Sequence, residues 1–465
     1  YFILLAFFMK FFINTLTLLF FLTSNSYSND NYLNEFNKFL LTKGIGKEIN
    51  ICKEEKRKSK KWFDAGCETR PGGVSTATNN LKIKFYQDRS SIPRKAKPKR
   101  DTLLYYTFFQ LIDDLGFDNV GSPGSDKPYQ FQFNLREDEN VKKEMNKSGL
   151  LSYLLFENNK IVVDEITPKE RFGLVFDDKT MWTSNSVGKS LVSYVTGHAI
   201  CGGYIESINS RMNDWPLIKN TLYDNQRLID VLNMAAGDIA YSRDTGKIAD
   251  LFKNKGRNIN PNNNSLKFHM EGYFKDSKMG KNTYNYSNIV PNIIINYVWY
   301  KSNGDFQKIL DTVFRTKIKS ENNISFLKMN SRTVTGKYPV KLEDGPIRYS
   351  FRATRYDFLR MAKAMMDDWN NDTCVGKYLK TVYENRIPKV SKAKEGLASY
   401  TMTNSYGGFF HTDYKGIDRP ILGMDGYGGQ SILIDMEKSR IVVINTVHSD
   451  YNWKKIVHSV IKNDG

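Results

Sequence analysis

Residues 183–190 read TSNSVGKS and open a predicted helix, because apolar residues follow them at helical spacing. Ser186 and Lys189 form an S-x-x-K tetrad within this stretch. Residues three apart lie on the same helix face, so the Lys189 amine is expected to lie one turn above the Ser186 hydroxyl. Burial lowers the pKa of a lysine, and a neutral amine can accept a serine proton. The tetrad therefore predicts a serine nucleophile with a lysine base.

The same stretch has a second interpretation, because it ends in Gly188-Lys189-Ser190, like a phosphate-binding P-loop. That motif, GxxxxGK[ST], requires a glycine where this chain has Thr183. Without that glycine the backbone cannot wrap around a phosphate. The sequence therefore favours the serine–lysine pair over nucleotide binding.

Two later segments contain groups that such a pair requires. Tyr286-Ser287-Asn288 is a Y-x-N triplet, in which Tyr286 is expected to carry protons to the leaving group and Asn288 to bind Lys189 or a substrate carbonyl. Residues 426–430 read GYGGQ and precede a predicted strand, so a backbone N–H there can complete an oxyanion hole with that of the serine. Taken alone, each segment is also typical of an ordinary loop or a glycine-rich turn.

Strand patterns occupy both ends of the region that contains these motifs. Residues 152–156 and 160–165 are apolar or β-branched runs on either side of a turn, and residues 431–435 and 439–445 form a second such hairpin. Helical patterns lie between the hairpins, at residues 186–199, 228–234, 288–301, 305–314 and 354–369. The sequence therefore predicts an α+β fold, with one antiparallel sheet built from both ends of this region and an inserted helical region.

The order of the three motifs resembles that of the serine β-lactamase and penicillin-binding superfamily. The chain is most similar to the class C β-lactamase-like esterases and to the 6-aminohexanoate-oligomer hydrolases, and the resemblance covers about residues 145–465. Further similar stretches are YSNIVPNIIINYV, FRATRYDFLRMAKAMM and GMDGYGGQSILIDMEKSRIVVIN. The resemblance implies a β-lactamase/transpeptidase-like fold and a hydrolase that works through an acyl-enzyme without a cofactor.

The resemblance also implies a role for each motif residue at its position in this chain. Ser186 is similar to the acylated nucleophile, Lys189 to its general base and Tyr286 to the catalytic tyrosine. The N–H of Tyr427, beside Gly428, is similar to the second oxyanion donor.

One departure from the superfamily pattern concerns the substrate. β-Lactamases and D-alanyl peptidases of the superfamily commonly carry a lysine or histidine at the third motif, and that cation helps to hold a substrate carboxylate. The matching stretch here is Gly426-Tyr427-Gly428, which has no cation, although Arg352 or Arg355 could supply one from elsewhere. The sequence therefore favours an esterase or amidase that acts on a small molecule or an oligomer. The alternatives are a peptidase or transpeptidase on cell-wall D-amino-acid peptides, a β-lactamase, and a non-catalytic envelope-binding protein.

The N-terminal region has the features of an export signal. Met9-Lys10 is a short basic start, Phe11–Leu22 is an apolar run, and Ser26-Tyr27-Ser28 is a small-x-small cleavage site. We therefore expect a signal peptide at residues 1–28, with residues 1–8 as upstream sequence, and a periplasmic or secreted protein. An uncleaved membrane anchor is the alternative, since the apolar stretch reaches the about 20 residues that span a bilayer.

The rest of the chain divides into two parts. Residues 29–145 are polar and charged and are predicted to form an N-terminal extension, and residues 146–465 the hydrolase domain. The net charge is +18, but the basic residues are spread along the chain and form no recognisable nucleic-acid module, so no nucleic-acid partner is expected. The five histidines lack the spacing of metal ligands, so no metal is expected.

The four cysteines can form disulfides in an exported protein. Cys52 and Cys67 are close enough in sequence for a local bridge. Cys201 and Cys374 are then either paired with each other or buried as free thiols.

Overall fold

The structure of the chain is a computed structural model of 465 residues. It describes residues 118–168, 176–242, 266–328, 347–389, 402–446 and 448–463. These residues all belong to the second of the two units into which the chain divides, residues 107–465. The predicted signal peptide at residues 1–28 and the predicted Cys52–Cys67 pair lie outside the described residues.

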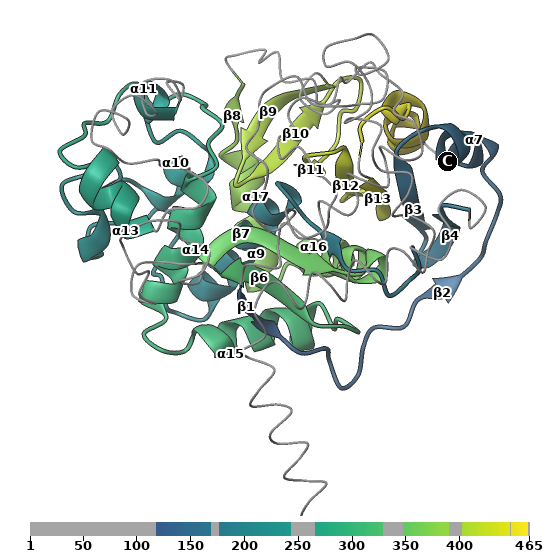
Figure 1. Ribbon diagram of the computed structural model, residues 1–465, viewed down its shortest axis with the longest axis horizontal. Coiled ribbons are helices and arrows are strands. Elements are labelled where there is room, and N and C mark those ends of the chain that lie inside the picture. The colour runs from purple at the N-terminus through teal and green to yellow at the C-terminus, as the bar shows by residue number, and fades with distance from the viewer. Residues whose placement is uncertain are drawn as a thin grey trace, which may run out of the picture. The chain divides into compact units, whose positions relative to one another are not determined.

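A nine-stranded sheet forms the larger part of the fold, with the strand order β2-β4-β3-β13-β12-β11-β10-β9-β8 (Figure 1). Its strands are β2 (Gln132–Phe133), β3 (Leu150–Glu157), β4 (Lys160–Ile166), β8 (Ile387–Pro388), β9 (Thr403–Gly407), β10 (Phe410–Tyr414), β11 (Ile421–Gly426), β12 (Gln430–Asp435) and β13 (Arg440–Thr446). Neighbours are antiparallel, except for β2 and β4. Within the sheet β3 pairs with β13, with Tyr153 opposite Ile444. The prediction of an antiparallel sheet built from both ends of the region is confirmed.

Helices cover both faces of this sheet. Leu155, Val442 and Leu433 lie opposite one another on β3, β13 and β12. They share a core cluster with residues of α7 (Glu139–Lys147), the π-helical η8 (Lys454–His458) and α19 (Ser459–Lys462). Helix α16 (Arg355–Asn370) packs against the same three strands but adds no described residue to that cluster, so it covers the other face. Burial on both faces explains the unbroken apolar runs within these strands, at residues 432–434 of β12 and 441–444 of β13.

The sequence predicts one sheet, but the structure has a second, four-stranded sheet in the order β1-β6-β7-β5. Its strands are β1 (Asp118–Ser122), β5 (Trp182–Thr183), β6 (Ile324–Lys328) and β7 (Ile347–Ala353). A strand as short as β5 shows no periodicity, and β1 precedes the region that resembles known hydrolases. Together β1, β2 and α7 lie in residues 118–147, so the folded domain includes part of the stretch that the sequence analysis assigned to the N-terminal extension.

Helix α9 (Val187–Cys201) lies inside the protein. Every residue from Val187 to Ala199 is buried, as expected of a helix that is enclosed on all sides. It packs against β7, β11 and three helices, α14 (Val290–Lys301), α15 (Phe306–Asp311) and α17 (Cys374–Glu384). The smaller helices α10 (Leu228–Leu232), α11 (Ile239–Ser242) and α13 (Leu266–Phe268) lie at the left of Figure 1, toward the β8 end of the nine-stranded sheet and away from β3 and β4.

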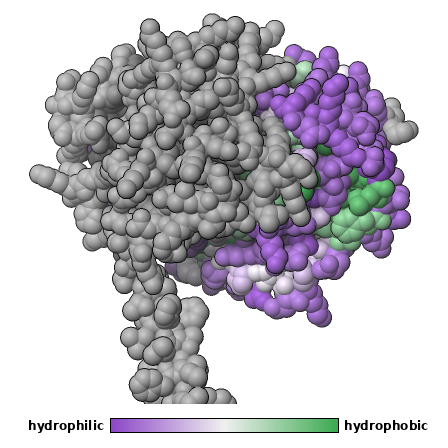
Figure 2. Space-filling view, turned by 45° about the vertical axis from the view of Figure 1, so that its right-hand side comes forward, coloured by the Kyte–Doolittle hydropathy of each residue, from purple (hydrophilic) through white to green (hydrophobic). Residues whose placement is uncertain are grey.

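Figure 2 brings the right-hand side of Figure 1 forward. The described residues on this face are mostly hydrophilic and include one small hydrophobic area. Phe133 of β2 and the nearby Leu135 are among the exposed large hydrophobic residues of the described chain. The helices that the structure describes include none that is both long and apolar enough to cross a membrane.

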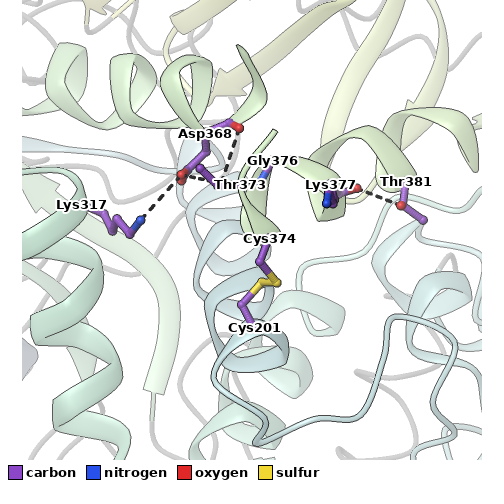
Figure 3. The surroundings of a disulfide bond; sticks show 8 residues. All are labelled: Cys201, Lys317, Asp368, Thr373, Cys374, Gly376, Lys377 and Thr381. Carbon is purple, nitrogen blue, oxygen red and sulfur yellow. Dashed lines mark hydrogen bonds and ion pairs between the residues drawn. A yellow bond between two sulfur atoms is a disulfide. The ribbon is translucent and has the colours of Figure 1, made fainter. Parts of the chain in front are cut away.

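A disulfide joins Cys201, the last residue of α9, to Cys374, the first residue of α17 (Figure 3). It links positions that are 173 residues apart. Beside it the Thr373 hydroxyl accepts a hydrogen bond from the Gly376 N–H at 3.0 Å and donates one to Asp368 Oδ1 at 2.8 Å, which caps α17. The sequence left Cys201 and Cys374 either paired with each other or buried as free thiols, and in the structure they are paired.

Replacing Cys201 and Cys374 together with serine is expected to lower the free energy of unfolding by about 2–5 kcal/mol, because the disulfide restricts a long loop of the unfolded chain. Urea unfolding with and without reductant measures the loss. The wild-type midpoint should fall further on reduction than that of the double variant, which keeps Cys52 and Cys67. A peptide map that joins these cysteines to other partners would contradict the pairing.

Candidate active site

Ser186 stands at the start of α9, in the N-cap position. The preceding residue, Asn185, has a φ of 48°, which is uncommon for a residue other than glycine and is often found at functional sites. The Ser186 side chain makes no capping hydrogen bond to the helix. Its hydroxyl therefore lies at the positive end of the helix and is available to hydrogen bond with another side chain.

That group is the Lys189 ammonium. Its Nζ atom lies 2.7 Å from Ser186 Oγ and 2.9 Å from Asn288 Oδ1. It also lies between two phenol rings, with 4.6 Å to the ring centroid of Tyr286 and 4.0 Å to that of Tyr349, both within cation–π range. Lys189 is 1 % exposed, so these four side chains take the place of water around its charge.

A buried carboxylate holds the loop that carries Tyr286. The neighbouring Asn285 donates its N–H to the Met234 carbonyl at 2.7 Å and its side-chain amide to Asp238 Oδ1 at 2.7 Å. The other oxygen of Asp238 accepts from the Tyr223 hydroxyl at 3.0 Å. The segment at residues 234–238 is thus joined to the loop at residues 285–288, beside Tyr286, the candidate proton carrier.

Tyr349 is a site residue that the sequence analysis missed. It lies on β7, and its hydroxyl donates to Asn288 Oδ1 at 3.3 Å. The strand can approach α9 because Gly188 has no side chain: a Cβ there would lie 2.1 Å from the Tyr349 carbonyl oxygen. Ser184 Oγ adds a link by accepting from the Phe351 N–H at 2.9 Å. A glycine inside a helical pattern signals such a close contact, so Gly188 was the clue in the sequence.

The titratable groups of the site shift one another's pKa values. Burial acts to lower the pKa of Lys189, but the phenols of Tyr286 and Tyr349 outweigh it, and the pKa is raised. Burial raises the pKa of Tyr286. Burial acts in the same direction on Tyr349, but Lys189 and Arg348 outweigh it, and the pKa of Tyr349 is lowered. The expected lowering of the Lys189 pKa is therefore wrong, because it counted burial and not the two phenols.

The glycine-rich segment lies next to the loop that carries the serine. Gly426 ends β11 opposite Gln430 of β12, and the residues between them form the turn of a hairpin. The Asn185 side-chain amide donates to the Tyr427 carbonyl at 3.1 Å, which fixes this turn to the residue before Ser186. Gly428 has a φ of 87°, a conformation that favours glycine. The structure thus brings all the predicted site segments together.

The two arginines considered as carboxylate-binding cations lie in different places. Arg355 is 1 % exposed, pairs with Asp164 and donates to the Glu165 carbonyl at 2.9 Å. It is held against β4 in the core, so the suggestion that Arg355 supplies a cation to the site is wrong. Arg352 lies on β7 opposite Thr183.

A buried charged cluster, also missed from the sequence, lies along the strands next to the glycine-rich turn. His411 Nε2 is 3.7 Å from Asp425 Oδ2, and His411 Nδ1 is 2.8 Å from Lys389 Nζ. Burial raises the pKa of Asp425 to about 7 and lowers that of Lys389 to about 7. Asp425 directly precedes Gly426, so this cluster sets the charge at the base of the turn. The described residues contain no group of three or more His, Cys, Asp or Glu side chains placed to hold a metal.

Comparison with known proteins gives no matching family model and no curated protein of similar sequence. Solved structures do match. A protein from Bacillus anthracis, provisionally described as a 6-aminohexanoate-dimer hydrolase, superimposes with a TM-score of 0.53 and 11% identity over 77% of this chain and 91% of that one. EstCE1, a hydrolase with promiscuous acyltransferase activity, superimposes with a TM-score of 0.49 and 11% identity, over 70% of this chain and 99% of that one. A class C β-lactamase mutant superimposes with a TM-score of 0.46 and 11% identity, over 70% of this chain and 94% of that one.

The described chain has the serine β-lactamase fold. Both the α+β class and the β-lactamase/transpeptidase-like architecture expected from the sequence are therefore confirmed. At this level of identity the similarity establishes the β-lactamase fold and leaves the activity to the residues of the site.

Replacing Gly188 with alanine is expected to disturb the site without unfolding the protein, because the new Cβ would press on the Tyr349 carbonyl and move β7 away from α9. We expect a fluorophosphonate to label Ser186 about a hundredfold more slowly, since a misplacement of about 1 Å can cost that much. Gly272→Ala is the control, because nothing lies within 4 Å of its Cβ position. Wild-type labelling rates in both variants would show that the contact between α9 and β7 does not shape the site.

Proposed function

We propose that this chain is a serine hydrolase that forms an acyl-enzyme at Ser186. The observation that carries the proposal is the 2.7 Å hydrogen bond between Lys189 Nζ and Ser186 Oγ at the start of a buried helix. A serine is a weak nucleophile until a neighbouring group takes its proton. Here the Lys189 ammonium contacts the hydroxyl, and two phenols and an amide surround that ammonium. This arrangement supplies a path for the proton and a fixed geometry.

In the proposed reaction, Ser186 Oγ attacks the substrate carbonyl and loses its proton to the cluster around Lys189. Tyr286 donates a proton to the leaving group, and Asn288 holds the Lys189 ammonium in place. The N–H groups of Ser186 and Tyr427 bind the oxyanion, a contribution worth about 10²–10³ in rate per donor in other enzymes. Water then attacks the acyl group and restores the Ser186 hydroxyl.

The substrate class that we propose is a neutral ester or amide. The turn at Gly426–Gly428 contains no cation, and Arg355 is held in the core by Asp164. A substrate carboxylate would therefore lack a charge-assisted partner from either source. The neighbour with the highest of the three TM-scores is described as a 6-aminohexanoate-dimer hydrolase, and the amide bond of such a dimer supports an amide as the group that reacts.

We further propose that the protein is exported and acts in the periplasm or outside the cell, on a small molecule or an oligomer. The Cys201–Cys374 disulfide supports this proposal, because disulfides persist in oxidising compartments and are rare in the cytosol. The membrane is a partner only if the N-terminal segment is retained, and N-terminal sequencing of the mature protein decides that point.

Replacing Ser186 with alanine is expected to abolish labelling by a fluorophosphonate and to reduce turnover of p-nitrophenyl butyrate by at least about 10³-fold, because the nucleophile is lost. Intact mass and steady-state kinetics measure the two effects. The control is Ser459→Ala at the start of α19, a part of the molecule that packs on η8. Labelling of the Ser186 variant at the wild-type rate would exclude Ser186 as the nucleophile, and an unlabelled wild type would favour a binding protein.

Nitrocefin is expected to be a poorer substrate than p-nitrophenyl butyrate when their kcat/KM values are compared. A charged hydrogen bond to a carboxylate contributes about 1.5–3 kcal/mol, so its absence costs about tenfold to a hundredfold or somewhat more. If nitrocefin has the higher kcat/KM, a cation such as that of Arg352 reaches the cleft, and the preference for neutral substrates is wrong.

A further inference from the structure

Two side-chain amides connect the loop before Ser186 with the glycine-rich turn. The Asn185 amide donates to the Tyr427 carbonyl at 3.1 Å. In the opposite direction, the Gln430 amide donates to the carbonyl of Thr183. Each segment thus supplies one donor and one acceptor to the other, and we call this pair of hydrogen bonds the amide clamp.

The backbones of the two segments also lie in close contact. A Cβ atom at Gly426 would lie 2.7 Å from the Ser184 carbonyl oxygen, so this approach requires glycine. The same carbonyl accepts the Val187 N–H at 3.2 Å, where the chain turns into α9. Gln430 is 2 % exposed, and a hydrogen bond is electrostatically stronger in such surroundings than in water. The clamp is therefore part of a tightly packed contact.

Each segment is also held by the elements around it. In the turn, the Gly429 N–H donates to the Gly426 carbonyl at 3.1 Å, and the Gly429 carbonyl accepts from the Tyr451 hydroxyl. In the loop before the helix, the Ser184 N–H donates to the Phe351 carbonyl of β7 at 2.8 Å. Since each segment is fixed in its own shape, the hydrogen bonds that cross between them set their relative position.

We propose that Asn185 and Gln430 are positioning residues for the oxyanion hole. The two N–H groups that are expected to bind the oxyanion belong to Ser186 and Tyr427, one in each of the segments that the clamp joins. Such donors are effective when they are fixed in advance where the negative charge develops. The inference rests on the proposed function, since it names the residues that hold the donors of that reaction in place.

This role predicts an effect on the transition state and not on substrate binding. The carbonyl oxygen becomes negatively charged only when Ser186 attacks, so misaligned donors should lower kcat and leave KM almost unchanged. A residue that binds the uncharged substrate would instead raise KM with kcat unchanged. Steady-state kinetics separate the two roles.

Asn185→Gly tests one half of the clamp in the full chain. Glycine adopts the φ of 48° found at this position, so the substitution removes the amide and keeps the backbone. We expect kcat for p-nitrophenyl butyrate to fall about tenfold to a hundredfold. Asn303→Gly is the matched control, because Asn303 also has a φ of 48° and is exposed just after α14. A wild-type kcat in the Asn185 variant, or a raised KM in its place, would overturn the proposal.

Gln430→Met tests the other half. Methionine fills a buried site of irregular shape but has no N–H donor, so kcat should fall over the same range. Because both hydrogen bonds hold one contact, the double variant with Asn185→Gly should lose little more than the larger single loss. Independent residues would multiply their losses. Losses that multiply would therefore contradict a shared clamp.

A trifluoromethyl ketone provides the readout that a purely structural role would not change. Ser186 Oγ adds to its carbonyl carbon, the hydroxyl proton passes to the cluster around Lys189, and the former carbonyl oxygen becomes the oxyanion. The inhibition constant should rise in each variant by about the factor by which kcat/KM falls, because both report binding of the oxyanion. A smaller folded fraction would lower kcat without changing the inhibition constant. An unchanged inhibition constant beside a lowered kcat would overturn the proposal.

The two levels of inference can fail separately. If Ser186→Ala is labelled by a fluorophosphonate as fast as the wild type, the proposed function fails. If the wild type is labelled at Ser186 and both clamp variants keep the wild-type kcat, the proposed function stands and the role of the clamp is wrong.

Discussion

The site depends on one buried charge, the ammonium of Lys189. Removing a charge from water costs several kcal/mol unless other groups replace the solvent. Here a hydroxyl, an amide oxygen and two ring faces surround Nζ, and they come from α9, the loop before α14 and β7. These three elements must meet for the charge to be tolerated. The inserted helices and the four-stranded sheet therefore position these groups around Lys189.

Local patterns in the sequence predicted the parts of this arrangement that are themselves local. The hairpins at both ends of the region have clear alternation or apolar runs, and their turns contain asparagine or charged residues, so the central sheet could be predicted. Ser186 and Lys189 lie on one helical turn, so the spacing alone predicted their contact. The chemistry of the Y-x-N triplet suggested its role, but spacing could not predict the contact, since Asn288 lies 99 residues from Lys189.

The remaining features depend on contacts between elements, which a single sequence does not contain. Tyr349 meets Lys189 because of the register of β7 against α9, and the only trace of this contact in the sequence is Gly188. The pKa of Lys189 moves against the expectation from burial because that second phenol is present. Arg355 was considered for the site on its type alone, whereas its partner Asp164 lies on β4, far from it in sequence.

The pairing of β3 with β13 has a consequence for how the molecule is made. Thr446 hydrogen bonds to the Gly149 carbonyl, 297 residues earlier, and β13 lies between β3 and β12 in the sheet. A ribosome that has completed α9 has not yet produced β12 or β13, the strands that join β3 to the rest of the sheet. Contacts of such long sequence separation form late and slowly, and the apolar strands stay uncovered until they do. The sheet is therefore expected to assemble only after nearly the whole chain has been synthesised.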